Sequence, residues 1–278
     1  MFKPTSVTTP LRLVTNSSLV DPETGLSLNS ILAKGPMYLN DMWEILVRFR
    51  SYEAGLIGDI SKAYYQIQTG PVEYHCRRVL WRFGEVGTPW RIFAFKVVSM
   101  GDTPAANFME ITKRKTTVRG EHIDRRGAKR LRDDGFVDDI SSGGSLSECK
   151  RFKGSEDPVT LACDGTWQQI LDTGGWDLKA MAMSWELDGE ALEKLGGAVL
   201  GLGWGTAEDM LKEKFRVNVS AYKRGEPTES DLTVDTLDRL ATAVITKRVC
   251  LRVVSSQYSP LGIACPLIII MKVQLKEL

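Results

Sequence analysis

Two adjacent aspartates, Asp138 and Asp139, lie inside a short apolar segment, residues 136–140. A strand that faces a protein core rarely carries two neighbouring carboxylates, because burial and like-charge repulsion both disfavour the ionised form. A divalent cation bound between the side chains is the usual compensation. A third acid, Asp59, lies at the end of another apolar run, residues 55–60. The sequence therefore predicts two strands whose acids meet at a metal site, although adjacent acids are more often a hydrated turn or a helix cap.

The composition is that expected of a soluble globular protein. The chain has 278 residues, of which 43% are hydrophobic. Its 36 basic and 35 acidic residues leave a net charge of +1, so any affinity for nucleic acid has to come from local basic clusters. Five widely spaced cysteines argue against a disulfide framework or a zinc site, and we expect a reducing, cytoplasmic location. The most apolar stretch, residues 261–273, is short and interrupted by proline, so no membrane segment is expected.

Hydrophobic spacing and turn residues predict the order of the elements. Helical spacing is found at residues 42–50, 61–67, 105–111, 166–171 and 232–254, and Pro104 suits the first turn of the third of these. Extended patterns are found at residues 11–14, 55–60, 136–140, 178–185 and 195–204, and a hairpin is predicted within residues 77–98. Pro260 and Gly262 separate the last helical pattern from a final apolar element.

A series of short motifs runs nearly from end to end in a specific order. They are residues 27–29 with 35–36, 59–65, 80–82, 101–107, 136–139, 174–179 and 200–204, followed in the tail by 246–248 and 258–262. In this order the chain resembles the reverse transcriptases of long-terminal-repeat retroelements, most closely those of BEL/Pao retrotransposons.

The resemblance implies an α+β fold with the palm of a right-hand polymerase, an antiparallel sheet backed by helices, together with small fingers and the start of a helical thumb. The expected segments are fingers (1–54), first palm strand and helix (55–70), fingers hairpin (71–98), palm (99–204) and the start of a thumb or connection (205–278). The implied activity is RNA-directed DNA polymerisation. The implied partners are an RNA or DNA template-primer duplex, deoxynucleoside triphosphates and other parts of a polyprotein, within the cell or a virus-like particle.

The chemistry of primer extension explains why acids are needed. A 3′-hydroxyl attacks the α-phosphate in line, and two divalent ions about 3.5–4 Å apart neutralise charge on the attacking and leaving oxygens. Magnesium or manganese prefers oxygen ligands and retains water. We expect Asp59 and Asp138 to bridge both ions; the resemblance implies Asp139 as the third acid and the backbone carbonyl of Ile60 as a further ligand.

Four residues are expected at the nucleotide by resemblance. Tyr64 would pack under the sugar and exclude a ribose 2′-hydroxyl, although a core aromatic is at least as common. Gly101 and Pro104 would form the loop and helix start beside the new base pair, or simply a turn before a helix. Lys179 would neutralise pyrophosphate, or be a solvated surface lysine. Met100 departs from the retroviral pattern, which has glutamine there.

A basic segment is expected to contact the phosphates of a duplex. Eight basic residues lie between residues 113 and 130, among them Lys113, Arg114, Lys115, Arg125 and Arg126. A solvated loop between two palm elements is the competing interpretation. By resemblance, Gly201 and Trp204 belong to a hairpin that supports the primer end, although a packed turn fits their composition as well.

A few further residues receive weaker expectations. Arg12 and Lys62 are placed to reach phosphates, but residues 14–28 offer no clear counterpart of the cation with which the fingers grip the triphosphate. Asp133 and Asp134 are assigned to solvent. His75 and His122 lack metal-ligand spacing and receive no role.

Three overall alternatives remain open from the sequence. The chain is an active polymerase, or an inactive or domesticated remnant that at most binds nucleic acid, or a phosphoryl-transfer enzyme of another palm-fold group such as a nucleotidyl cyclase. The three acids favour the first, whereas Met100 and the missing fingers cation favour the second. No protease, RNase H or integrase pattern is present, and we expect the chain to be a fragment or a degenerate open reading frame of a larger polyprotein.

Overall fold

The computed structural model describes residues 15–84, 87–155, 157, 162–185, 198–213, 216–217, 230–231, 238 and 246–277. The chain divides into two compact units, Met1–Ala182 and Met183–Leu278. The five segments expected from the sequence are finer than this division and stay predictions. The extended pattern at residues 11–14, and Arg12 with it, lies outside the described residues.

The first unit is a mixed α+β structure around a four-stranded antiparallel sheet backed by helices. The strand order is β4-β5-β1-β6. The bounds are β1 Ala54–Ile60, β4 Gly135–Phe136, β5 Asp139–Gly144 and β6 Leu178–Met183. Except at Asp59, every residue of β1 is buried, which explains its nearly continuous apolar sequence. The strands predicted at residues 55–60 and 178–185 are thus confirmed within two residues at their ends.

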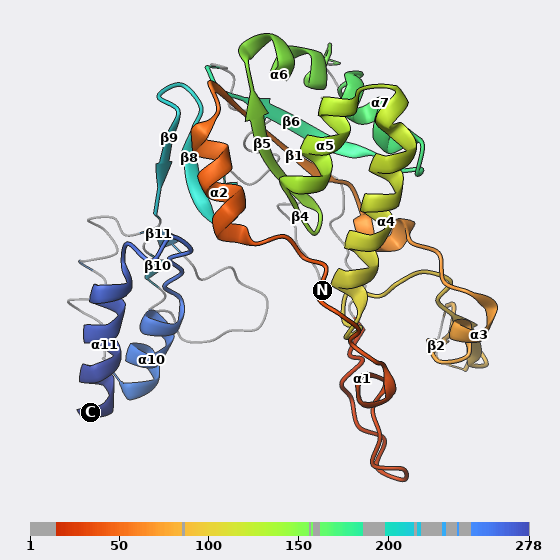
Figure 1. The fold of residues 1–278 in the computed structure, drawn as a ribbon. Helices are drawn as coiled ribbons and strands as arrows, with labels where there is room; N and C mark the ends of the chain where they lie inside the picture. Colours follow the sequence, from red (N-terminus) through yellow and green to blue (C-terminus); the bar gives the residue numbers. More distant parts are fainter. Residues whose placement is uncertain are drawn as a thin grey trace. The chain divides into compact units, whose positions relative to one another are not determined.

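Five helices accompany this sheet, and Figure 1 shows α2 and α5 beside its strands. Their bounds are α2 Met42–Ser51, α4 Ala105–Arg119, α5 Arg125–Asp133, α6 Leu146–Lys153 and α7 Thr166–Asp172. The helices at residues 42–50 and 166–171 are confirmed. Helix α4 begins as predicted, with Pro104 at its N-cap, but continues for eight residues beyond 111 through the basic segment. The solvated-loop interpretation of that segment is therefore wrong, since α4, a 3₁₀ turn at Gly120–His122 and α5 occupy it.

The core of this unit lies between the sheet and the helices. Phe49 of α2 and Leu131 of α5 are at most 1% exposed, as is Ile140 of β5. The rings of Phe152 and Trp167 stack with their centroids 5.5 Å apart, which joins α6 to α7. Burial of such side chains contributes about 1.5–3 kcal/mol each. This packing fixes the strands that carry the acids.

Shorter elements complete the first unit. They are α1 Leu28–Ile31, the 3₁₀ turn η1 Ala63–Gln66, α3 Pro71–Tyr74, and the hairpin strands β2 Arg78–Trp81 and β3 Arg91–Ala94. The antiparallel pairing of β2 with β3 confirms the predicted hairpin. The predicted helix at residues 61–67 is present as η1.

In its described residues, the second unit contains small sheets and two helices. The bounds are β7 Ala198–Val199, β8 Leu202–Gly205, β9 Met210–Lys212, β10 Arg216–Val217, β11 Ser230–Asp231, α10 Lys247–Ser255 and α11 Cys265–Glu277. The single strand predicted at residues 195–204 is instead the β7-β8 hairpin where it is described. Most of the helix predicted at 232–254 lies outside the described residues, and α10 is its described end. The break at Pro260 and Gly262 is confirmed. Among the described residues, no helix has the length and apolar character needed to cross a membrane.

Candidate functional site: three acids at one end of the sheet

Asp59 and Asp139 are direct partners across two neighbouring strands. Asp59 of β1 is opposite Asp139 of β5 in the antiparallel register. Directly opposed residues in such a pair project from the same face, with Cβ atoms about 4.5–5.5 Å apart. Two like charges in that position destabilise a sheet. The expected convergence of the two segments is confirmed, and its unfavourable electrostatics require a compensating positive charge.

Asp138 lies in the turn and not within a strand, which corrects the predicted strand at residues 136–140. Phe136 pairs with Asp139, so Val137 and Asp138 form a two-residue turn between β4 and β5. Val137 has a φ of +55°, a left-handed conformation that a β-branched residue rarely adopts. The amide of Ile60 donates a hydrogen bond of 2.9 Å to the carbonyl of Asp138. This bond ties the turn to the end of β1, beside Asp59.

The acids perturb one another's protonation. Partial burial, and then the charges of Asp138 and Asp59, raise the pKa of Asp139 to about 7. Burial also raises the pKa of Asp138. Asp139 as a residue is exposed, so water screens part of this repulsion. Carboxylates that resist ionisation near neutral pH are typical of functional sites.

Two lysines provide nearby positive charge. The ammonium of Lys179 on β6 lies 3.6 Å from Oδ2 of Asp59, and both side chains are partly exposed. The charges of Lys113 and Lys179 lower the pKa of Asp138 and of Asp139, against the stronger effect of burial. The structure therefore places Lys179 at the acids, where the sequence expected a lysine near the triphosphate.

Tyr64 of η1 is close to the acids as well. It is partly buried, and burial, followed by the charge of Asp138, raises the pKa of its hydroxyl to about 12. Lys62 precedes η1 with a φ of +50° and is exposed.

The acids form an open set of oxygen donors. No group of three or more His, Cys, Asp or Glu side chains within the described part of the chain is arranged to hold a metal ion. Magnesium in phosphoryl-transfer sites is bound by one or two carboxylates together with substrate phosphates and water. Asp59 and Asp139, on one face of adjacent strands, match that requirement in number and chemistry. Asp138 lies beside them.

Gly101 and Pro104 lie in a loop that is held in place by other parts of the first unit. The carbonyl of Gly101 accepts a 2.9 Å hydrogen bond from the Asn29 side chain. Asp102, between them in sequence, is buried and forms a 2.7 Å ion pair with Arg77. Asp102 also lies on the wall of a cavity of about 920 Å³ that includes aromatic residues of the β2-β3 hairpin. The described lining of this cavity does not include the three acids, so we do not take it as the reaction site.

The basic segment is less available to nucleic acid than its sequence suggests. Lys113 is fully buried, so the expected contact between Lys113 and a phosphate is wrong for this structure. Arg114 is partly exposed, but its guanidinium donates to Glu110 and Asn40. Lys115, Arg125 and Arg126 are exposed. Of the five basic residues of this segment for which the sequence predicts phosphate contacts, these three are exposed at the surface.

Trp204 of the second unit also departs from its expected role. It is 3% exposed, and its indole N–H donates a 3.0 Å hydrogen bond to Asp209. A buried indole has no free face for a base, so a direct contact with the primer is wrong. Gly201 occupies the β7-β8 turn with a φ of +90°, and a Cβ there would collide with the ring of Tyr258. The structure therefore agrees with a packed turn, the second interpretation of this segment given by the sequence.

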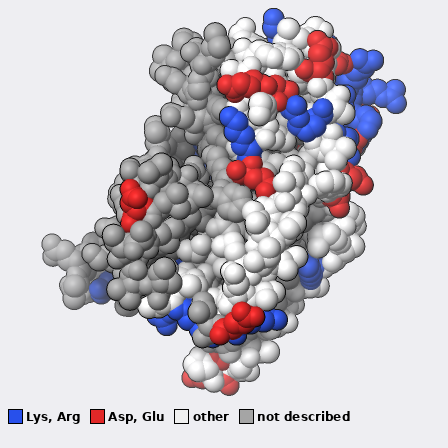
Figure 2. Space-filling model, turned by 90° about the vertical axis from the view of Figure 1, so that its left-hand side faces the viewer, with Lys and Arg blue, Asp and Glu red and all other residues white. Residues whose placement is uncertain are grey.

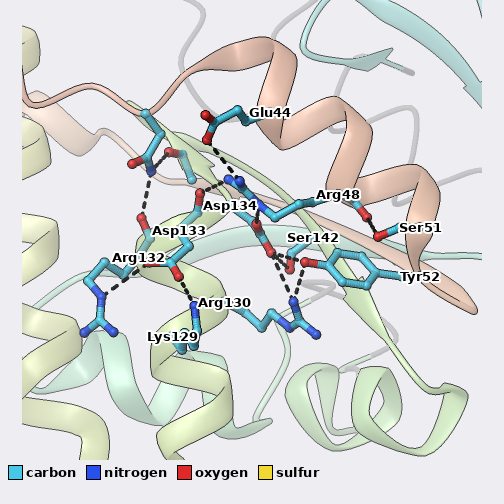
Figure 3. A network of polar contacts seen from close by, with 12 residues as sticks. Glu44, Arg48, Ser51, Tyr52, Lys129, Arg130, Arg132, Asp133, Asp134 and Ser142 are labelled. Atoms are coloured by element: carbon cyan, nitrogen blue, oxygen red, sulfur yellow. Dashed lines mark hydrogen bonds and ion pairs between the residues drawn. The ribbon is translucent and has the colours of Figure 1, made fainter.

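The expectation that Asp134 faces solvent is wrong, because it is 1% exposed at the centre of a polar network. Figure 3 shows its carboxylate between side chains of α2, β5 and the segment that joins α2 to β1. Arg48 Nε donates to it over 2.7 Å and the Tyr52 hydroxyl over 2.9 Å. Ser142 of β5 donates to it as well. The neighbouring Asp133 pairs with Lys129 and Arg132 on the partly exposed side of α5.

The chain matches no known family model and no curated protein.

Proposed function

We propose that the chain is an RNA-directed DNA polymerase that transfers nucleotides to a primer 3′-hydroxyl at Asp59, Asp138 and Asp139. The observation that carries the proposal is the cross-strand pairing of Asp59 with Asp139, at the turn that holds Asp138. Two opposed carboxylates destabilise a sheet and add nothing to its packing. A cation-binding role accounts for their placement, because a bound cation would relieve the repulsion that raises the pKa of Asp139.

The acids have a defined task in this proposal. Asp59, Asp138 and Asp139 would hold two magnesium or manganese ions, with the carbonyl of Ile60 as an additional donor. Bound divalent ions lower the pKa of the attacking hydroxyl and neutralise charge on the departing pyrophosphate. Because the pKa of Asp139 is raised, a bound cation has to displace a proton from this carboxyl at neutral and lower pH.

Two neighbouring residues fit the handling of a nucleotide. Lys179, whose ammonium lies 3.6 Å from Oδ2 of Asp59, would neutralise negative charge on the pyrophosphate group. The charge of Asp138 contributes to the raised pKa of the Tyr64 hydroxyl, so the two side chains are close. Tyr64 would support the sugar and disfavour a ribose 2′-hydroxyl. Lys115, Arg125 and Arg126 would contact the duplex backbone. The right-hand arrangement of palm, fingers and thumb belongs to the same proposal, and the antiparallel sheet backed by helices supports its palm.

Primer extension tests the proposal. Incorporation of dTTP on poly(rA)–oligo(dT) with Mn²⁺ should fall at least about a hundredfold in Asp138→Asn and in Asp139→Asn, because several kcal/mol of charge stabilisation are lost. Asp133→Asn is the matched control, since it neutralises a partly exposed acid of α5 that is paired on the surface, and it should retain activity within about twofold. Incorporation by the unmodified chain that is no higher than by Asp138→Asn contradicts polymerisation. Duplex binding without incorporation would instead identify a nucleic-acid-binding remnant.

A further inference from the structure

A fully buried lysine lies beneath the turn that carries Asp138. Lys113 of α4 has 0% side-chain exposure. A lysine is almost never fully buried without a partner, because desolvation of the ammonium is costly. Its position follows the buried face of α4, where Ala105, Met109 and Thr117 are spaced by four residues with it. The side chain of Lys113 therefore points to the interior, because it lies on the buried face of the helix.

The ammonium has two partners inside the protein. It lies 2.7 Å from Oε2 of Glu110, which is also fully buried and pairs with Arg114 on its other oxygen. It also donates a 3.2 Å hydrogen bond to the backbone carbonyl of Val137. Ion pairing with Glu110 offsets part of the desolvation cost. The hydrogen bond to Val137 connects Lys113 to the turn that carries Asp138.

Gly135 makes room for this contact. A Cβ built at Gly135 would lie 2.7 Å from Nζ of Lys113 and 2.8 Å from the carbonyl of Leu131. Any side chain at this position would therefore displace the ammonium from the turn. The absence of a side chain at Gly135, the first residue of β4, thus leaves space for the ammonium of Lys113.

The contact holds a conformation that is unfavourable by itself. Val137 has a φ of +55°, a sparsely populated region that is energetically unfavourable for a residue other than glycine. The carbonyl of Val137 belongs to the peptide that leads into Asp138, and the carbonyl of Asp138 accepts from the amide of Ile60. The peptides on both sides of Asp138 are thus anchored, one by Lys113 and the other by the end of β1.

We propose that Lys113 is a positioning residue that holds the strained Val137–Asp138 turn in the conformation that presents Asp138 next to Asp59 and Asp139. The role of the turn in binding divalent ions rests on the proposed polymerase function, whereas the anchoring of the turn does not. Glu110 keeps the ammonium buried, and Gly135 gives it access to the carbonyl. Lys113 touches neither substrate nor metal in this role.

The test compares Glu110→Gln with Glu110→Gln/Lys113→Met. The single variant removes the buried carboxylate and keeps the Lys113 nitrogen, which donates to the carbonyl of Val137 whether it is charged or neutral. The double variant then removes this donor without leaving a buried carboxylate unpaired. Methionine has a similar length and lacks the donor. Amide hydrogen exchange of Ile60 reports whether the turn stays attached to β1, independently of any metal. We expect Ile60 to exchange about tenfold faster in the double variant, the size expected for loss of the hydrogen bond between Lys113 and Val137, with Leu56 and Ile57 unchanged.

A third variant separates anchoring from general stability. Val137→Gly in the double-variant background removes the strain, because glycine adopts positive φ readily, and should return Ile60 exchange to within about threefold of Glu110→Gln. Unchanged Ile60 exchange in the double variant, or uniform acceleration through β1, overturns the positioning role.

Mn²⁺ affinity measured on the same variants tests the connection to the acids. We expect it to fall about tenfold in Glu110→Gln/Lys113→Met and to recover with Val137→Gly. Faster Ile60 exchange in a chain whose Mn²⁺ affinity is insensitive to Asp138→Asn would support the anchor and overturn the proposed function. Mn²⁺ binding that depends on Asp138 while Ile60 exchange is unchanged would do the reverse.

Discussion

Asp139 differs from an ordinary surface acid in the pH at which it ionises. Burial and the neighbouring carboxylates of Asp138 and Asp59 raise its pKa to about 7, with Lys179 and Lys113 acting in the opposite direction. In the unfolded chain its pKa is 3.8. Between about pH 4 and pH 7 the unfolded chain therefore releases a proton that the folded chain retains, and rising pH favours unfolding. The acid weakens the metal-free fold at neutral and alkaline pH.

Replacement of Asp139 by asparagine should accordingly stabilise the metal-free protein. Solvent screening at this exposed residue reduces the gain to on the order of 1 kcal/mol, or about 2–4 °C in melting temperature, at pH 8. The difference should vanish below about pH 4, where the carboxyl is protonated in both states. Thermal melts in EDTA at the two pH values measure it. A variant that melts at or below the wild-type temperature at pH 8 would show that the acids do not repel one another as described.

At the scale of the elements, Asp134 joins the helices to the strand that carries Asp139. Arg48 and Tyr52 donate to its carboxylate from one side, Ser142 of β5 donates from another, and Arg130 lies over the ring of Tyr52 (Figure 3). Burial, and then the charge of Asp134, raise the pKa of Tyr52 to about 12. The network therefore holds α2 and α5 against the base of the β4-β5 hairpin.

Asp134→Ala should lower the free energy of unfolding by about 3 kcal/mol, because it leaves buried donors without their acceptor. Asp133→Ala is the matched neighbour; its carboxylate is 35% exposed and paired on the surface, so its loss should cost less than about 1 kcal/mol. Urea unfolding followed by circular dichroism measures both. Equal costs for the two substitutions would contradict the central place of Asp134 in the network.

The sequence predicts the elements of the first unit better than the burial of their charges. Apolar spacing places β1, α2 and α7 correctly, because these segments bury continuous or periodic apolar faces. The sequence predicts a phosphate contact for Lys113 and a solvent-facing position for Asp134, but both residues are buried. The spacing of Lys113 from Met109 indicates the buried face of α4, but only the fold supplies Glu110 and Val137 as partners. Asp134 follows the last residue of α5. The sequence has two adjacent aspartates at this point and does not indicate which of them is buried.

At the scale of the whole molecule, charge is balanced. The net charge is +1, and on the face seen in Figure 2 acidic and basic side chains lie next to one another, with much of the remaining described surface carrying neither. The proposed attraction to a nucleic acid therefore depends on local groups of exposed residues that include Lys115 and Arg125. The meeting of the acids could be expected from the two apolar strands that carry them. The turn conformation at Val137 could not, since valine does not indicate a positive φ.

The most direct measurement for this account is a Mn²⁺ titration at pH 8, followed by electron paramagnetic resonance, on the unmodified chain and on Asp59→Asn, Asp138→Asn and Asp139→Asn. Each substitution removes one oxygen donor and one negative charge, so each should weaken binding by about tenfold or more. Asp133→Asn, which alters a surface acid of the same sequence neighbourhood, should bind Mn²⁺ like the unmodified chain. Affinities in the three variants that equal those of Asp133→Asn would show that the three acids do not act as one cation site.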